Sequence, residues 1–131
     1  DYMSLSTIET DRPGNTYTAD TLAQIYDSYK KIYFIIGADS LLYIQDWYHP
    51  EYICSHCHLL CANRDNNSAS VLIDQKHFLA DKYGAVIDFI DVPELPYSST
   101  DIRKKVAMGL SVKEDVGEEV EEYIKSRKLY V

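Results

Sequence analysis

The chain is acidic and has the composition of a globular protein. Its 131 residues suit one domain, spanning residues 1–131, that can bury a hydrophobic core. Hydrophobic residues make up 46% of the chain and only five residues are glycine, which argues against a largely disordered protein. The formal net charge of −8 argues against nucleic-acid or anionic-membrane partners, because a broad acidic surface repels phosphate groups. Any phosphate ligand must therefore be held by local geometry.

The cysteines and the hydropathy of the chain indicate in which cellular compartment the protein is expected. No apolar run approaches the roughly 18 residues of a membrane-spanning helix, so we expect no membrane partner. The three cysteines cannot all pair with one another and lie close together, which predicts a reducing, cytoplasmic environment. The first residue is Asp1 and not Met, and we expect the natural protein to be longer.

The first third of the chain predicts a strand, a turn and a helix. Residues 3–9 alternate weakly between apolar and polar, which indicates an exposed strand, and "DRPGN" indicates a turn. Thr18 is the predicted N-cap of a helix whose Leu22 and Ile25 lie on one face.

Short apolar runs then alternate with helical segments. Strands are predicted at residues 32–36, 58–62 and 85–90, the first of them buried on both faces. Helices are predicted at residues 39–46, 50–54, 74–83 and 117–127, and another begins at Ser98 or Ser99 and stops at Gly109. This alternation predicts an α/β protein with a parallel sheet, in which ligands lie beyond the carboxyl ends of the strands.

The segment "SSTDIR", residues 98–103, could bind phosphate. A helix start presents free N–H groups and partial positive charge, and Ser99 and Arg103 lie on one helix face. Arginine can hold a phosphate with two hydrogen bonds. The same residues also fit plain helix capping, since Ser98 precedes Asp101 by three positions. Both interpretations stay open on spacing alone.

Three further residues suggest a nucleotide site. Gly37 follows the first apolar run and would let a ligand approach the backbone, and Asp39 could accept hydrogen bonds from ribose hydroxyls. Trp47, the only tryptophan, lies in a connection and could stack on a planar ring. The alternatives are an N-cap role for Asp39 and a core-anchoring role for Trp47.

The segment "CSHCHLLC" holds five possible zinc ligands, namely Cys54, His56, Cys57, His58 and Cys61. However, His58 and Cys61 fall within a predicted buried strand, where a cysteine serves as a small hydrophobic residue. No second ligand pair follows at zinc-finger spacing. We therefore expect no structural zinc at this segment.

Taken together, the motifs resemble bacterial nicotinate-mononucleotide adenylyltransferases. The matching segments are "NTYTADTL" (15–22), "YFIIGADSLLYIQDWYHPEYI" (33–53), "CHLLCANRD" (57–65), "YSSTDIRKKVAMG" (97–109) and "VEEYIKSRKLY" (120–130). The resemblance covers essentially the whole chain in the family's order. It implies a Rossmann-like nucleotidyltransferase fold with C-terminal helices, here incomplete at the N-terminus. It also implies adenylyl transfer from ATP to nicotinate mononucleotide, with Mg²⁺ accompanying the ATP phosphates.

The resemblance implies a role for each matching residue. Ser98, Thr100 and Arg103 would hold ATP phosphates, with Ser99 lining the turn, while Gly37 and Asp39 would meet the adenosine ribose. For the nicotinate nucleotide, Trp47 would stack on the ring, Tyr48 and Thr18 would lie near its carboxylate, and Arg64 is a further candidate.

One departure from the family affects the chemistry. The family's Gly-Phe-Asp-Pro-x-His-x-Gly-His segment, whose histidines stabilise the transferring phosphate, does not occur in these 131 residues. Phosphoryl transfer depends on such positioned donors, so we predict no catalytic residue in this chain and little turnover by it. We also expect that a surface left uncovered at the N-terminal side favours self-association. The alternatives are a non-catalytic nucleotide-binding or interaction module of the same fold, an enzyme acting on flavin mononucleotide or phosphopantetheine, and a zinc module on the cysteine segment.

Overall fold

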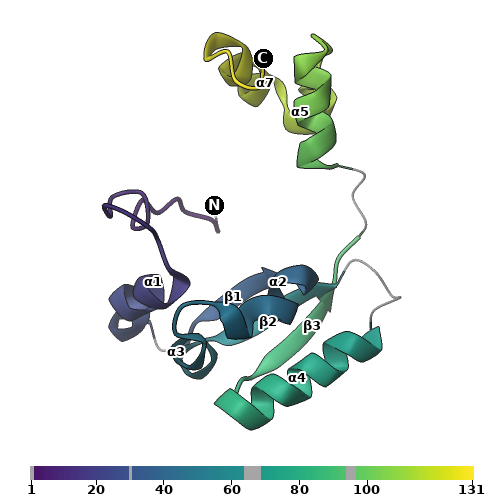
Figure 1. The fold of residues 1–131 in the computed structure, drawn as a ribbon. Coiled ribbons are helices and arrows are strands. Elements are labelled where there is room, and N and C mark those ends of the chain that lie inside the picture. The colour runs from purple at the N-terminus through teal and green to yellow at the C-terminus, as the bar shows by residue number, and fades with distance from the viewer. Residues whose placement is uncertain (1, 30, 64–68, 94–96) are drawn as a thin grey trace. The chain divides into compact units, whose positions relative to one another are not determined.

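The computed structural model describes residues 2–29, 31–63, 69–93 and 97–131 (Figure 1). The chain divides into two compact units, residues 1–93 and residues 94–131. The first unit contains a sheet with helices, and the described residues 97–131 of the second form helices and no strand. The expectation of one domain over residues 1–131 stays a prediction.

The first unit is built on a three-stranded parallel sheet in the order β1-β2-β3. The strands are β1 (Tyr33–Gly37), β2 (His58–Asn63) and β3 (Ile87–Asp91). All pairs are parallel, with Ile36 opposite Cys61 and Cys61 opposite Phe89. The predicted parallel α/β sheet is confirmed, because each apolar run forms a strand and a helical crossover joins it to the next.

Helices pack on one face of this sheet and form the core. They are α1 (Thr18–Ile25), α2 (Ala38–Tyr43), α3 (Pro50–His56) and α4 (Ala69–Tyr83), with 3₁₀ turns at Tyr26–Ser28 and Ile44–Asp46. Leu59 and Cys61 of β2 are fully buried in one cluster with Ile53 of α3 and Leu79 of α4. The apolar positions of these helices face the same side of the sheet, which is why the unit has a single core.

The opposite face of β1 is exposed. Ile35 is 68% exposed and Tyr33 is 50% exposed, whereas Ile36 is buried. The prediction that this strand is buried on both faces is therefore wrong for the unit described. Successive side chains of a strand point to opposite faces, and the packed helices cover only the face of Ile36.

The segment before α1 also differs from expectation. Within the described chain, residues 2–7 adopt no regular secondary structure, and a turn follows in which Asp11 N donates to Thr7 O at 2.9 Å. The strand predicted at residues 3–9 is wrong, because the segment pairs with no neighbouring strand in the described part. Helix α1 has Tyr17 as its N-cap and Thr18 as its first helical residue, one position from the prediction.

The second unit contains α5 (Ser99–Ala107), α6 (Lys113–Val116) and α7 (Glu118–Ser126). Gly109 has a φ of 72° and ends the α5 segment, as predicted, because glycine tolerates the left-handed region. The sequence did not predict α6. Glu121 of α7 accepts hydrogen bonds from Ser111 Oγ (2.7 Å) and Val112 N (2.8 Å), and so fixes the start of α6.

Candidate functional site

An aromatic hollow of about 380 Å³ lies where the start of α1 approaches the turn between α2 and α3. The structure brings together three residues predicted to bind the nicotinate nucleotide, Thr18, Trp47 and Tyr48. The sequence did not single out the other lining residues, which are Thr16, Tyr17, Asp46 and Ile53. The volume falls within the range of about 300–1,000 Å³ typical of small-molecule sites.

The turn that carries the two aromatic residues has a constrained backbone. Trp47 is extended at the end of the 3₁₀ turn, and His49 has a φ of 50°, in the left-handed region. Pro50 follows as the first residue of α3, a position where its missing N–H costs nothing. This sequence of conformations holds Trp47 and Tyr48 at the hollow and directs the chain into the next helix.

Trp47 serves both as an anchor and as a lining residue. Its side chain packs against the core and meets Phe34 edge-on, with 6.3 Å between the ring centroids. The core-anchoring alternative is therefore correct, and it does not exclude ligand stacking because Trp47 also lines the hollow. The ring of Tyr48 packs on that of Tyr17 at 4.5 Å, which joins the two walls.

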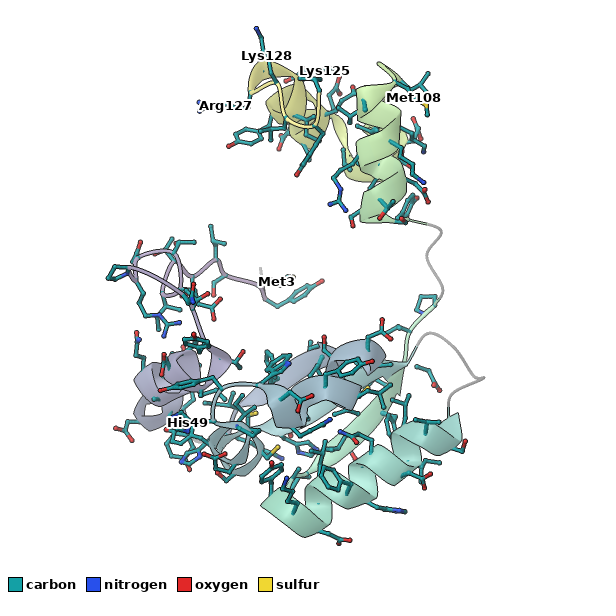
Figure 2. All side chains as sticks on the ribbon, viewed as in Figure 1. Met3, His49, Met108, Lys125, Arg127 and Lys128 are labelled. Atoms are coloured by element: carbon teal, nitrogen blue, oxygen red, sulfur yellow. The ribbon has the colours of Figure 1, made fainter. Side chains whose placement is uncertain are left out.

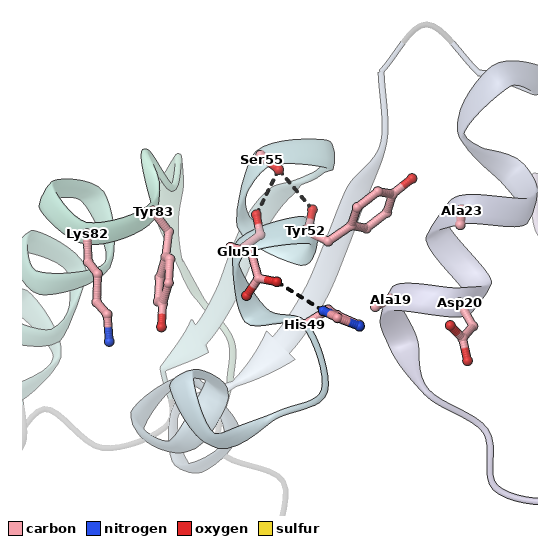
Figure 3. Close-up of a pocket in the computed structure, with 9 residues that line it drawn as sticks. All are labelled: Ala19, Asp20, Ala23, His49, Glu51, Tyr52, Ser55, Lys82 and Tyr83. Carbon is pink, nitrogen blue, oxygen red and sulfur yellow. Dashed lines mark hydrogen bonds and ion pairs between the residues drawn. The ribbon is translucent and has the colours of Figure 1, made fainter.

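His49 connects this turn to a second hollow. Figure 3 shows that hollow, of about 580 Å³, between residues of α1, of α3 and of the last turn of α4. His49 Nδ1 lies 3.0 Å from Glu51 Oε1, and it is labelled near α1 and α3 in Figure 2. The pKa of Glu51 is lowered, first by a hydrogen bond to its own backbone N–H and then by His49. Both side chains are more than half exposed, so salt screens their attraction.

Gly37 and Asp39 lie at the carboxyl end of β1, where ligands bind in parallel sheets. Gly37 is the N-cap of α2, and Asp39 lies exposed in its first turn. Asp39 is therefore not the N-cap, so that alternative is wrong. A Cβ at Gly37 would meet no described atom within 4 Å, so the neighbouring chain does not itself require glycine there. Arg64 lies outside the described residues.

The predicted phosphate segment forms the start of α5 in the second unit. Ser98 is the N-cap, and its Oγ accepts a hydrogen bond from Asp101 N at 3.2 Å, so the predicted cap is confirmed. Ser99, Thr100 and Arg103 are exposed in the first turns. The Ser98 hydroxyl can still donate to a phosphate while its oxygen accepts from the backbone. Capping and phosphate binding are thus compatible at this helix start.

The cysteine segment is part of the hydrophobic core. Cys54, Cys57 and Cys61, all within the described residues, are free and buried. Burial raises the pKa of Cys54 to about 11 and that of Cys57 to about 12. His58 Nε2 lies 2.9 Å from Asp88 Oδ2. Among the residues with described positions, no three His, Cys, Asp or Glu side chains form a group able to hold a metal ion.

The helices were compared with the length and hydropathy of membrane-spanning segments. Over the described ranges, no helix combines the length and the apolar character needed to cross a membrane. The cytoplasmic location stays a prediction.

Comparisons with known proteins agree with this architecture. Residues 2–105 match the model of a family described as cytidylyltransferase-like. A relative from Thermoanaerobacter sp. (strain X514), named "Probable nicotinate-nucleotide adenylyltransferase", is 38% identical over 98% of this chain and 63% of its own length. A relative of the same name from Lachnoclostridium phytofermentans is 35% identical over 99% of this chain and 66% of its own length. The chain thus spans just under two thirds of the length of these relatives.

A solved structure supports the fold. The Plasmodium falciparum nicotinic acid mononucleotide adenylyltransferase complexed with APC superposes with a TM-score of 0.66 at 18% identity. The superposition covers 90% of this chain and 60% of that protein. The expected nucleotidyltransferase fold and the resemblance to nicotinate-nucleotide adenylyltransferases are both confirmed.

Proposed function

This chain belongs to the cytidylyltransferase-like family, and from that premise we propose that it carries the substrate-binding part of a nicotinate-nucleotide adenylyltransferase. The reaction joins a phosphate oxygen of nicotinate mononucleotide to the α-phosphorus of ATP. The bond from that phosphorus to the β-phosphate bridging oxygen breaks, and pyrophosphate leaves. The products are nicotinate adenine dinucleotide and pyrophosphate, on a route to NAD.

The aromatic hollow is the observation that carries this proposal. Trp47 lies at a hollow large enough for a pyridine ring, and a positively charged pyridinium gains from contact with an aromatic face. Thr18 and Tyr48 line the same hollow and supply hydroxyl donors for the ring carboxylate. Relatives that carry the nicotinate-nucleotide name match this chain over nearly its whole length, which supports the same assignment.

The start of α5 is assigned to ATP. Ser98, Thr100 and Arg103 lie exposed in the first turns of a helix, where N–H groups and the helix dipole favour phosphate. Gly37 and Asp39, at the end of β1, are assigned to the adenosine ribose. The residues at the start of α5 would position the ATP phosphates, and positioning supplies much of the rate enhancement in phosphoryl transfer.

Magnesium fits as part of the ATP substrate. Mg²⁺ keeps several waters and binds mainly through substrate phosphates with one or two carboxylates. Asp101 lies in the first turn of α5 and is the carboxylate of this helix start that would hold the hydrated ion. When bound, the ion neutralises charge on the phosphates.

The family's histidine segment does not occur within these 131 residues, so we expect these residues on their own to bind both substrates but to turn over little.

Thermal stabilisation by ligands tests the substrate assignment. A ligand present at about 100 times its Kd stabilises the folded chain by about 2.7 kcal/mol. We expect nicotinate mononucleotide to raise the Tm, and flavin mononucleotide and phosphopantetheine at equal concentration to leave it unchanged. A rise with either of the latter two and none with nicotinate mononucleotide would overturn the proposal.

A further inference from the structure

We propose that Thr21 is a positioning residue for the aromatic hollow, acting with Glu9 and Arg12. These three side chains form a polar clamp, which ties residues 9–12 to α1 and thereby holds the wall formed by Thr16 and Tyr17. Only the identity of the ligand rests on the function proposed above; the clamp itself rests on the contacts that follow.

The clamp is a chain of short polar contacts centred on one hydroxyl. Arg12 Nη2 donates to Thr21 Oγ1 at 2.5 Å, and the same hydroxyl donates to Glu9 Oε1 at 2.7 Å. Arg12 Nη2 also lies 3.9 Å from Glu9 Oε1. Thr21 is therefore the bridge between an acid and a base that are too far apart for a good direct hydrogen bond.

The burial of Arg12 makes this bridge important. The Arg12 side chain is only 19% exposed, and its Nε and Nη1 are buried with no hydrogen-bond partner among the described residues. Within the described part of the chain, Thr21 Oγ1 is thus the close acceptor of the one Arg12 nitrogen that has such a partner. A partly buried cation that loses such an acceptor is destabilised, so Arg12 would leave its position rather than stay without it.

Release of Arg12 would loosen the wall of the hollow, because only a few residues separate Arg12 from that wall. Residues 13–17 form a closed loop between Arg12 and the start of α1, and this loop supplies Thr16 and Tyr17 to the hollow. The ring centroids of Tyr17 and Tyr48 lie 4.5 Å apart, and both residues line the hollow together with Trp47. Opening the clamp gives this loop back its conformational freedom, which a ligand must then restrict again on binding.

Three substitutions in the 131-residue chain separate the clamp from general effects. Thr21→Val removes the hydroxyl at nearly constant shape, whereas Thr21→Ser keeps it. Thr10→Val is the matched control: Thr10 Oγ1 donates to Thr7 O at 3.0 Å within the same segment but makes no link to α1.

Two readouts follow Trp47, one without and one with ligand. In the first, acrylamide quenching of Trp47 fluorescence reports how open the hollow is. We expect greater quenching in Thr21→Val than in wild type, with Thr21→Ser and Thr10→Val like wild type. In the second, titration with nicotinate mononucleotide is expected to show about tenfold weaker binding for Thr21→Val alone, the scale of one hydrogen bond to a charged group.

The two readouts distinguish failure of the clamp from failure of the proposed function. If acrylamide quenches Trp47 equally in Thr21→Val and in wild type, the clamp is refuted, irrespective of the affinity for nicotinate mononucleotide. Greater quenching in Thr21→Val, with no binding of nicotinate mononucleotide by wild type, supports the clamp and overturns the ligand assignment. Equal loss in Thr21→Ser and Thr21→Val would also refute the clamp, because the hydroxyl would then be irrelevant.

Discussion

Substitutions at Ser98 distinguish a role in helix capping from a role in phosphate binding. Its Oγ accepts from Asp101 N at 3.2 Å, so Ser98→Ala removes a cap worth about 1 kcal/mol. That loss corresponds to about fivefold faster hydrogen exchange of the first-turn amides of α5. Ser98→Asp keeps a side-chain acceptor at the N-cap and adds a negative charge, which the helix dipole favours.

The two variants are expected to differ in nucleotide affinity. Ser98→Ala loses a hydrogen bond to a charged phosphate and should bind Mg-ATP about tenfold more weakly. In Ser98→Asp a negative charge would face the phosphate, and for two charges separated by about 4 Å the repulsion is about 1 kcal/mol in water and about 4 kcal/mol near a protein surface. We therefore expect its affinity to fall at least about fivefold while amide protection stays at the wild-type level.

Calorimetric titration with Mg-ATP and hydrogen exchange are the matching assays. Ser126→Ala is the control, because Ser126 Oγ donates to Tyr123 O in α7, away from the start of α5. It should leave affinity for Mg-ATP unchanged. If Ser98→Asp binds Mg-ATP as tightly as wild type does, Ser98 is only a cap and the phosphate assignment fails.

Three further predictions concern stability and thiol chemistry. Leu59→Ala, at a fully buried site in β2, should lower the free energy of unfolding, measured by urea denaturation, by about 2–5 kcal/mol. Ile35→Ala, on the open face of β1, should lower it by less than about 0.5 kcal/mol. Equal losses in the two variants would contradict a core on one face of the sheet. The pKa of Glu121 is lowered from 4.5 to about 2, mainly by the Ser111 hydrogen bond. The stabilisation by ionised Glu121 is therefore present above pH 4.5 and is lost as the pH falls toward 2. Glu121→Gln should remove this decrease in stability between pH 4.5 and pH 2. A pH–stability curve equal to that of wild type would show that Glu121 does not stabilise the fold in this way. The raised pKa of Cys54 and Cys57 should make both thiols react with Ellman's reagent at pH 8 far more slowly in the folded chain than in urea, and equal rates would contradict their burial.

The strands and their parallel order could be predicted because continuous apolar runs alternate with helical segments. The open face of β1 could not, because Ile35 and Ile36 are chemically alike and only the packing of helices decides which of them is covered. Helix α6 was missed because four residues are too short to show a period, and its start is fixed by Glu121 from another helix.

The candidate site was predictable only in part. Trp47 stands out because it is the only tryptophan and lies in a connection, whereas Tyr48 and Thr18 are assigned to the site only through the resemblance to the family. Nothing in the sequence marks Thr16 and Asp46 as site residues. They lie far apart in the chain and line one hollow only because α1 approaches the turn after α2 in the folded protein. Tyr17 could have been found as the neighbour of Thr18 within "YTADTL".

Fluorescence of the lone Trp47 tests the central claim most directly. The 131-residue chain would be titrated with nicotinate adenine dinucleotide, with the nicotinamide form as the comparison, while tryptophan emission is followed. Stacking of the nicotinate ring on Trp47 predicts saturable quenching that is weakened in Arg103→Ala, because the phosphates lose their guanidinium partner. A chain that is folded by circular dichroism and shows no quenching at saturating dinucleotide would contradict the assignment of the aromatic hollow to the nicotinate ring.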